Sequence, residues 1–219
     1  MPSTPEPLTG PDDPVRDPPA EQPDPARRRR RRLLVLLGVL SITILAADQL
    51  TKAWALAALA PGGRITLVGH VLGLSLVLNP GAALSIATGM TWVLTLVACT
   101  VAVVIVRASR RIGSGEWALA LGLLLGGALG NLVDRVVREP GPGRGEVVDF
   151  IAYGNLFVGN VADLAIVVAA GLIVLLTVRG IGIDGSRDER PPREAAPVSG
   201  VPDDGTGARD AVAEKPADV

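Results

Sequence analysis

The sequence predicts an all-α membrane protein with four transmembrane helices. Hydrophobic residue types make up 48% of the 219 residues, and they are gathered in four blocks. Charge and proline are concentrated instead in the two tails and in short connectors. Each apolar block approaches the roughly 20 residues that an α-helix needs to cross about 30 Å of hydrocarbon. This distribution, rather than the average composition, favours a membrane protein over a soluble domain.

The first block follows six consecutive arginines, Arg27–Arg32, and extends over LLVLLGVLSITILAADQLTKAWALAALA. A basic segment before an apolar one also resembles a signal peptide. This apolar region is too long for the usual core of a signal peptide, and three further spans follow. We therefore expect a retained first helix.

The other three spans are expected at about 88–106, 116–137 and 160–178. The stretch 64–79 is also apolar, but it is shorter between its polar ends and is interrupted by two glycines. Its β-branched residues and partial alternation, as in LSLVL, are typical of strands. We predict strands there and no fifth span.

The basic residues of the short connectors predict the orientation. With four spans, one group of arginines falls together on one side: Arg27–Arg32, Arg107, Arg110, Arg111 and Arg179. Because connectors rich in arginine and lysine stay in the cytoplasm, both termini are expected there. Segments 61–87 and 138–159 are then expected outside.

Three regions follow from this pattern. Residues 1–32 are expected to be a disordered cytoplasmic tail that ends in the arginine run, 33–179 the membrane domain, and 180–219 a second disordered cytoplasmic tail. The tails are rich in proline and acid and hold few large apolar residues, so burial cannot offset the entropy cost of ordering them. We expect membrane lipids as neighbours, no nucleic-acid partner, and a monomer.

The single cysteine and the single histidine limit the possible chemistry. Cys99 lies within an apolar run, so it is expected to be a small buried residue, and no disulfide can form within one chain. One histidine, His70, excludes a cluster of histidine ligands and disfavours a Ser-His-Asp mechanism. We expect no metal and no cofactor.

Ionisable residues nevertheless occur in three of the spans. At 1.5 Å per residue, Asp48, Asp134 and Asp163 all lie about 22–26 Å above the cytoplasmic helix ends. A charge inside a membrane is costly, so carboxylates that reach one layer on separate helices favour a common site. A local alternative remains open, in which Asp48 pairs with Lys52 at i,i+4 and Arg135 extends outward to water.

A further carboxylate, Asp149 in EVVDF, comes fourteen residues before Asp163. The segment between them is too short to be a span, so it must return to the membrane surface and bring Asp149 near the start of the last helix. Two carboxyl groups that share a dehydrated pocket do not both ionise easily. Such a pair can activate a water and protonate the departing nitrogen of an amide.

Five motifs resemble the signal peptidase II family, bacterial membrane aspartyl peptidases that act on prolipoproteins. They are DQLTK (48–52), NPGAALS (79–85), GNLVDR (130–135), VVDF (147–150) and NVAD (160–163), in the family's order. The resemblance covers about 33–179. It implies four transmembrane helices with a small extracytoplasmic β-cradle and a short periplasmic helix, for which 64–79 and 140–158 would supply the chain.

The resemblance also implies roles for particular residues. Asp149 and Asp163 correspond to the catalytic pair, and no cofactor is implied. The matched positions that would support the site or hold the substrate are Asp48, Lys52, Asn79, Gly81, Gly130, Asn131, Asp134, Arg135 and Asn160. The expected partners are lipid-modified prolipoproteins, which would be cut just before the lipidated cysteine.

The sequence departs from the family at three places. Phenylalanine is common where Leu84 and Gly159 stand, and threonine is frequent where Pro80 stands. These changes spare the carboxyl pair, but they affect the expected shape of the substrate groove.

Two other classes of function are open to the same residues. Carboxylates in membrane helices also relay protons in transporters, although such proteins spread polar residues through the bilayer and often contain repeats. A non-catalytic assembly factor could use the same charges to bind a partner helix.

Overall fold

The computed structural model describes residues 24–81 and 91–187, which all belong to the compact unit Met1–Asp188. Of the tails expected at 1–32 and 180–219, residues 1–23 and 188–219 lie outside the described residues. The helices of the structure are α1 (Pro25–Ala58), α2 (Thr91–Ser109), α3 (Gly115–Val137) and α4 (Val161–Val178). Its strands are β1 (Ile65–Val68), β2 (Leu72–Asn79), β3 (Val147–Tyr153) and β4 (Phe157–Gly159).

All four helices are long and apolar enough to cross a membrane, which confirms the four predicted spans. The chain is therefore a multi-pass membrane protein. α3 contacts each of the other three helices and is the most buried of them. Cys99 of α2 is exposed on the outside of this bundle, so its predicted burial is wrong. A helix that faces lipid can place apolar side chains outward without contact to protein.

Consecutive glycines allow α3 to approach two neighbours. A Cβ atom at Gly126 would lie 2.7 Å from Cβ of Ile44 in α1, and one at Gly127 would lie 2.6 Å from the carbonyl oxygen of Ala162 in α4. Successive residues of a helix point about 100° apart, so the two glycines face different helices. The central position of α3 thus depends on two missing side chains.

α1 begins earlier than the sequence analysis expected. Pro25 occupies the first turn, and Asp24 caps the helix by accepting from the backbone N–H of Ala26 at 3.0 Å. Proline is favoured at the first helical position and arginine is a good helix former. The arginine run is therefore helical, and the assignment of residues 25–32 to a disordered tail is wrong.

The segment after α4 is ordered as well. Ile181 forms an isolated bridge with Arg187, and its carbonyl oxygen accepts from Nε1 of Trp117 at 2.8 Å. Gly113 donates its backbone N–H to the carbonyl oxygen of Ile183 at 2.9 Å. The expectation of disorder is wrong for residues 180–187, because this short segment packs on the α2–α3 connection.

The four strands form one antiparallel sheet in the order β1-β2-β3-β4, which confirms the strands predicted within 64–79. In the pairing of β2 with β3, Val77 lies opposite Asp149. The segment 140–158 forms turns and strands without a helix. The short periplasmic helix therefore does not lie in that segment, and residues 82–90 are outside the described part of the chain.

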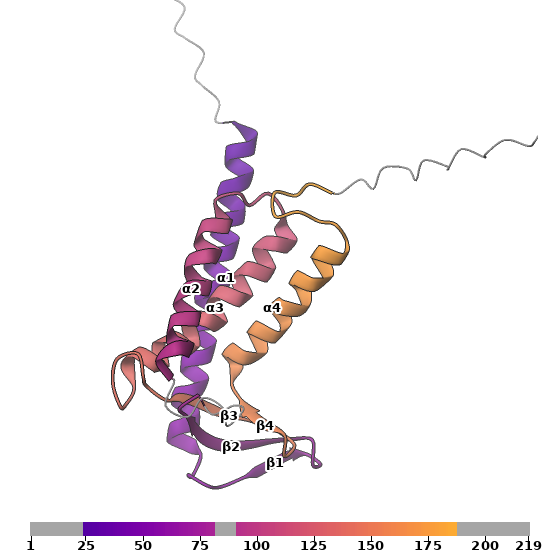
Figure 1. Ribbon diagram of the computed structural model, residues 1–219. Coiled ribbons are helices and arrows are strands. Elements are labelled where there is room, and N and C mark those ends of the chain that lie inside the picture. Colours follow the sequence, from indigo (N-terminus) through magenta and orange to yellow (C-terminus); the bar gives the residue numbers. More distant parts are fainter. Residues whose placement is uncertain (1–23, 82–90, 188–219) are drawn as a thin grey trace, which may run out of the picture. The chain divides into compact units, whose positions relative to one another are not determined.

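The two ends of the bundle differ in character (Figure 1). The sheet lies where α1 ends and α4 begins, and we call this the sheet end. The opposite end holds the first turns of α1, which carry Arg27–Arg32, and the last turns of α2 and α4. We call it the arginine end.

Candidate active site

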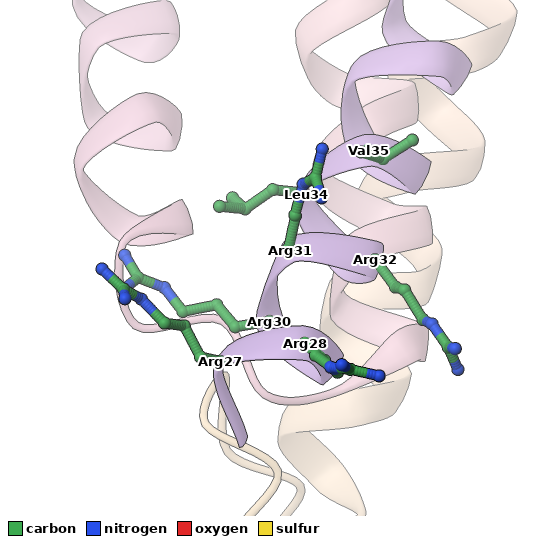
Figure 2. A pocket seen from close by; sticks show the side chains of 7 residues that line it. All are labelled: Arg27, Arg28, Arg30, Arg31, Arg32, Leu34 and Val35. Carbon is green, nitrogen blue, oxygen red and sulfur yellow. The ribbon is translucent and has the colours of Figure 1, made fainter. Parts of the chain in front are cut away.

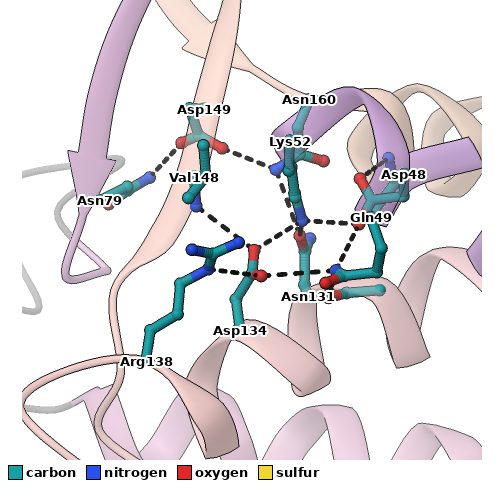
Figure 3. A network of polar contacts seen from close by, with 12 residues as sticks. Asp48, Gln49, Lys52, Asn79, Asn131, Asp134, Arg138, Val148, Asp149 and Asn160 are labelled. Carbon is teal, nitrogen blue, oxygen red and sulfur yellow. Dashed lines mark hydrogen bonds and ion pairs between the residues drawn. The ribbon is translucent and has the colours of Figure 1, made fainter. Parts of the chain in front are cut away.

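The predicted site residues meet at the sheet end, where Figure 3 labels Asp48, Lys52, Asn79, Asn131, Asp134, Asp149 and Asn160. They come from the last third of α1, the end of β2, the second half of α3, the middle of β3 and the start of α4. In chain order they are Asp48, Lys52, Asn79, Gly81, Gly130, Asn131, Asp134, Arg135, Asp149, Asn160 and Asp163. Many of them are buried, and Asp48, Lys52, Asp134 and Asn160 have no exposed surface.

Asn160 joins the two candidate catalytic carboxyl groups. Its side-chain Nδ2 donates to Oδ1 of Asp149 at 2.6 Å, and its backbone N–H donates to Oδ2 of Asp163 at 3.2 Å. Its side-chain oxygen in turn accepts from the backbone N–H of Asp163 at 2.9 Å, which completes a capping box at the start of α4. One residue therefore begins the helix and also brings Asp149 and Asp163 together.

Asn79 holds the second oxygen of Asp149. Its Nδ2 donates to Oδ2 of Asp149 at 2.9 Å, while its Oδ1 accepts from the backbone N–H of Gly81 at 2.8 Å. The second contact orients the amide, because only its oxygen can accept. Gly81 has a φ of 107°, and a Cβ there would lie 2.7 Å from Cδ1 of Leu94. Glycine is thus required at this turn.

Asn131 holds the second oxygen of Asp163. Its Nδ2 donates to Oδ1 of Asp163 at 2.8 Å. Its own Oδ1 accepts from Nζ of Lys52 at 3.0 Å and from Nδ2 of Asn160 at 3.2 Å. Because an ammonium group can only donate, Lys52 fixes the orientation of this amide. Both oxygens of each carboxyl group therefore have an N–H donor.

Behind the pair lies a buried ion network. Nζ of Lys52 contacts Oδ2 of Asp48 at 2.7 Å and Oδ2 of Asp134 at 2.8 Å. Asp48 also accepts from the backbone N–H of Ala162 at 2.9 Å, and Asp134 from that of Val148 at 3.3 Å. The local pair considered for Asp48 and Lys52 exists, but it is one part of a network that ties α1 and α3 to β3 and α4.

Two members of this network were missed from the sequence. Nε of Arg138 contacts Oδ1 of Asp134 at 2.8 Å. Nε2 of Gln49 donates to the carbonyl oxygen of Gly130 at 3.1 Å and to Oδ2 of Asp48 at 3.2 Å. The i,i+4 spacing of Asp134 and Arg138 was a usable signal. For Gln49 the only signal was its place within DQLTK.

Gly130 is placed by close packing rather than by chemistry. A Cβ at this position would lie 2.5 Å from Oδ2 of Asp48. Only glycine leaves room for the Asp48 carboxylate against α3. The site therefore needs this residue for its shape.

Arg135 is 8% exposed, so the alternative in which it extends outward to water is wrong. Its Nη1 is buried and finds no hydrogen-bond partner among the described residues. The carboxylates of Asp134, Asp149 and Asp163 all interact electrostatically with its guanidinium. A buried donor beside the carboxyl pair is thus available to a ligand.

Burial raises the pKa of Asp149 from 3.8 to about 6. The hydrogen bond from Asn79 lowers this pKa, the negative charge of Asp163 raises it, and the hydrogen bond from Asn160 lowers it. Asp149 is 2% exposed, whereas Asp163 is only partly buried. The two carboxyl groups therefore have unequal surroundings, as expected for an acid and a base that act together.

One departure from the family pattern lies directly at the pair. A Cβ at Gly159 would lie 3.1 Å from Oδ2 of Asp163, so a side chain here would press on that carboxylate. Pro80 accepts from the hydroxyl of Thr91 through its carbonyl oxygen. Leu84 lies outside the described residues.

The fold and the site together define a multi-pass membrane protein with a buried cluster of carboxyl, amide and basic side chains at the sheet end. The model of the family described as signal peptidase (SPase) II matches residues 40–179. The chain belongs to this peptidase family, as the five motifs indicated.

Named relatives and solved structures agree with this assignment. The lipoprotein signal peptidase of Rhodococcus jostii (strain RHA1) is 54% identical over 153 residues, which are 70% of this chain and 77% of the relative. The lipoprotein signal peptidase of Mycolicibacterium smegmatis is 45% identical over 195 residues, which are 89% of this chain and 82% of the relative. A bacterial membrane enzyme structure solved by the in meso method at 1.9 Å matches with a TM-score of 0.57 and 25% identity, over 64% of this chain and 91% of that one.

Proposed function

We propose that this protein is an aspartyl endopeptidase that removes the signal peptide from diacylglyceryl-modified prolipoproteins. It cuts the amide just before the lipidated cysteine. The observation that carries the proposal is the contact of Asn160 with both Asp149 and Asp163, which holds two carboxyl groups at one centre. The name lipoprotein signal peptidase, borne by relatives at 45–54% identity, supports the choice of substrate.

The unequal surroundings of the two carboxyl groups suggest their roles. Asp163, the less buried, takes a proton from a water, whose oxygen attacks the amide carbonyl carbon. Asp149, with its raised pKa, carries the proton of the pair and gives it to the carbonyl oxygen. The product of this step is a neutral tetrahedral diol.

The second step reverses the direction of the protons. Asp149, now ionised, takes a proton from one hydroxyl group of the diol, while Asp163 gives its proton to the amide nitrogen. The carbon–nitrogen bond then breaks. The signal peptide leaves with a new carboxyl end, and the lipidated cysteine leaves with a free amino group.

The charges around the pair are consistent with a single shared proton. Three cations, Lys52, Arg135 and Arg138, lie at the site beside the two carboxylates Asp48 and Asp134. One further negative charge makes the site neutral, and that charge is the one left on the pair when it holds one proton. A neutral buried site avoids the cost of an uncompensated charge.

Arg135 is the residue we expect to meet the substrate directly. Its buried Nη1 is without a hydrogen-bond partner in the described part of the chain, although it lies beside the carboxyl pair. A peptide carbonyl oxygen would satisfy this donor and fix the scissile bond near the pair. Asn131 and Asn160 then act as positioning residues for the carboxyl groups.

We place the sheet end at the outer face of the bacterial cytoplasmic membrane, with both termini in the cytoplasm. The apolar surfaces of the helices let the acyl chains of the substrate stay in the bilayer while its peptide reaches the pair. The substrate therefore arrives sideways through the membrane.

The decisive experiment uses the full chain in detergent with a lipidated prolipoprotein. Asp149→Asn and Asp163→Asn each remove one acid–base group and keep its shape, so we expect turnover to fall by about 10²–10⁴-fold while substrate binding persists. Asp184→Asn, in the exposed segment after α4, is the matched control and should keep full turnover.

Full turnover in either site variant would remove that residue from catalysis. Intact binding with no cleavage by the wild-type protein would favour an assembly factor. Proton flux across vesicles that is lost in both variants, without any cleavage, would favour a transporter.

A further inference from the structure

The arginine end of the bundle carries a surface that the peptidase chemistry does not use. Arg27–Arg32 form the first turns of α1, and all six side chains are exposed. A hollow of about 890 Å³ lies against them. Its lining consists of Arg27, Arg28, Arg30, Arg31, Arg32, Leu34 and Val35, shown in Figure 2.

These arginines lack anionic partners within the described part of the chain. The ion pairs found among the described residues all involve Lys52 or Arg138, at the sheet end. Arg29, which does not line the hollow, interacts electrostatically with Glu116. Five guanidinium groups therefore face the hollow without a carboxylate in its lining.

The helix sorts these side chains onto two faces. Residues spaced i, i+3, i+4 and i+7 share a face, so Arg27, Arg30 and Arg31 line up with Leu34. In Figure 2, Arg27 and Arg30 extend to one side of α1, whereas Arg28 and Arg32 extend to the other. Arg31 extends along the helix toward Leu34, so this face places three arginines beside an aliphatic side chain.

The depth of this face suits a lipid headgroup. Leu33, Leu34 and Leu37 pack in the apolar cluster of Ile105, Trp117 and Leu176, so the helix bundle begins at this level. The run Arg27–Arg32 directly precedes Leu33 in the chain, so the arginines lie on the part of α1 that extends outward from the bundle. Phosphate groups of a bilayer lie just beyond its hydrocarbon, and basic residues beside a transmembrane helix attract anionic lipids.

A second basic hollow occurs at the same end of the bundle. It is lined by Arg107, Arg110 and Arg111 of the α2 end with Val104, Ala108, Ile183 and Asp184. This hollow differs from the first because its lining includes a carboxylate, Asp184. It therefore offers a matched set of three arginines with a different environment.

We propose that Arg27, Arg30 and Arg31 bind the phosphate headgroup of an anionic phospholipid, with Leu34 against its acyl chain. Guanidinium groups bind phosphate oxygens through paired hydrogen bonds, which an ammonium group cannot reproduce. The lipid would anchor the first turns of α1 at the membrane surface. The proposal does not depend on the peptidase function.

The test measures lipid binding to the full chain in detergent by native mass spectrometry and titration. Phosphatidylglycerol and phosphatidylcholine are compared as probes, with inorganic phosphate as a soluble competitor. The variants are the triple change R27Q/R30Q/R31Q, its charge-preserving counterpart R27K/R30K/R31K, and the charge-matched control R107Q/R110Q/R111Q. Helix content by circular dichroism confirms that each variant is folded.

We expect the wild type to prefer phosphatidylglycerol, and R27Q/R30Q/R31Q to weaken this binding at least about tenfold. The affinity of R27K/R30K/R31K for phosphatidylglycerol should lie between those of the wild type and R27Q/R30Q/R31Q. The control R107Q/R110Q/R111Q should bind this lipid nearly as tightly as the wild type does. Equal losses in both glutamine variants would mean a diffuse attraction and would overturn the site. Displacement of the lipid by inorganic phosphate, or equal affinity for both lipids, would also overturn it.

Discussion

Three asparagines control the carboxyl pair, because each amide is oriented by a second contact. Gly81 orients Asn79, Lys52 orients Asn131, and the first turn of α4 orients Asn160. A free amide could present its oxygen to a carboxylate and repel it. The oriented amides present N–H groups instead, so each carboxyl group of the pair meets hydrogen-bond donors.

The raised pKa of Asp149 predicts a pH dependence with a definite sign. The pKa of Asp149 is raised from 3.8 to about 6, so this proton donor loses its proton only as the pH rises through about 6. We therefore expect kcat/KM to fall in that range. Asn79→Ala removes a hydrogen bond that lowers this pKa, so the pKa rises and the alkaline limb moves to higher pH. The pH profile of kcat/KM measures both effects.

Asn155→Ala is the matched control for this change. Asn155 accepts a hydrogen bond from Arg64 in an exposed turn. Loss of this side chain should leave the pH profile of kcat/KM unchanged. If the alkaline limb of Asn79→Ala does not shift, or shifts to lower pH, the assigned role of Asp149 is contradicted.

Lys52 is the residue on which the buried network depends most. It balances Asp48 and Asp134, and all three side chains are fully buried. Lys52→Met leaves Asp48 without its ion-pair partner and Asp134 with Arg138 as its remaining one, so we expect a loss of about 3–5 kcal/mol in stability. Thermal unfolding in detergent measures it.

The double variant Asp48→Asn/Lys52→Met separates charge from shape. It leaves the Asp134–Arg138 pair balanced, so it should unfold at a higher temperature than Lys52→Met alone. If the two variants unfold at the same temperature, the cost arises from lost packing and not from unpaired charge.

Among the elements, α3 has the central role, because it supplies site residues and also packs on the other three helices. Its second half carries Asn131, Asp134 and Arg135, while its glycines set the distance to α1 and α4. The helix-to-helix distance therefore determines whether Lys52 of α1 can reach Asp134. The packing of α3 on its neighbours therefore also sets the geometry of the site.

Gly126→Ala tests this dependence. The added Cβ would lie 2.7 Å from Cβ of Ile44 and 2.8 Å from the carbonyl oxygen of Ser41, so α1 must move away. Overpacking of this kind costs about 1–3 kcal/mol, and we expect a lower unfolding temperature with reduced turnover.

Gly38→Ala, also within a membrane helix, is the control. A Cβ at Gly38 meets nothing within 4 Å, and alanine is the better helix former. Its unfolding temperature should be unchanged or higher. Equal destabilisation by both changes would show that close packing at Gly126 is not the cause.

For the whole molecule, the opposite characters of the two ends predict its orientation. The connecting segments at the arginine end carry Arg27–Arg32, Arg107, Arg110, Arg111 and Arg179, whereas the described ones at the sheet end carry Arg64, Arg138 and Arg144. Because basic connectors stay in the cytoplasm, the sheet end should face outward.

Cysteine labelling in intact spheroplasts measures this orientation. In a Cys99→Ser background, Asn155→Cys lies in an exposed turn of the sheet and Ser186→Cys in the exposed segment after α4. A membrane-impermeant maleimide should label position 155 at once and position 186 only after permeabilisation. The reverse pattern would place the site on the cytoplasmic side.

The sequence by itself determined the four spans, the strands within 64–79 and the residues of the site. Span length and hydrophobicity are local properties, and the motif residues were visible in order along the chain. The local pattern misled at residues 180–187, where order depends on distant contacts. Residues 180–187 are ordered because Trp117 binds Ile181, and nothing within that segment predicts such a contact.

Only the tertiary structure decided how the polar groups pair. It added Gln49 and Arg138 to the network and turned Arg135 inward with a buried donor. It also showed that Asn160 serves both Asp149 and Asp163. The physical reason is that the partner of a buried charge depends on how closely α1, α3 and α4 approach, and that distance is set by packing rather than by the order of residues along the chain.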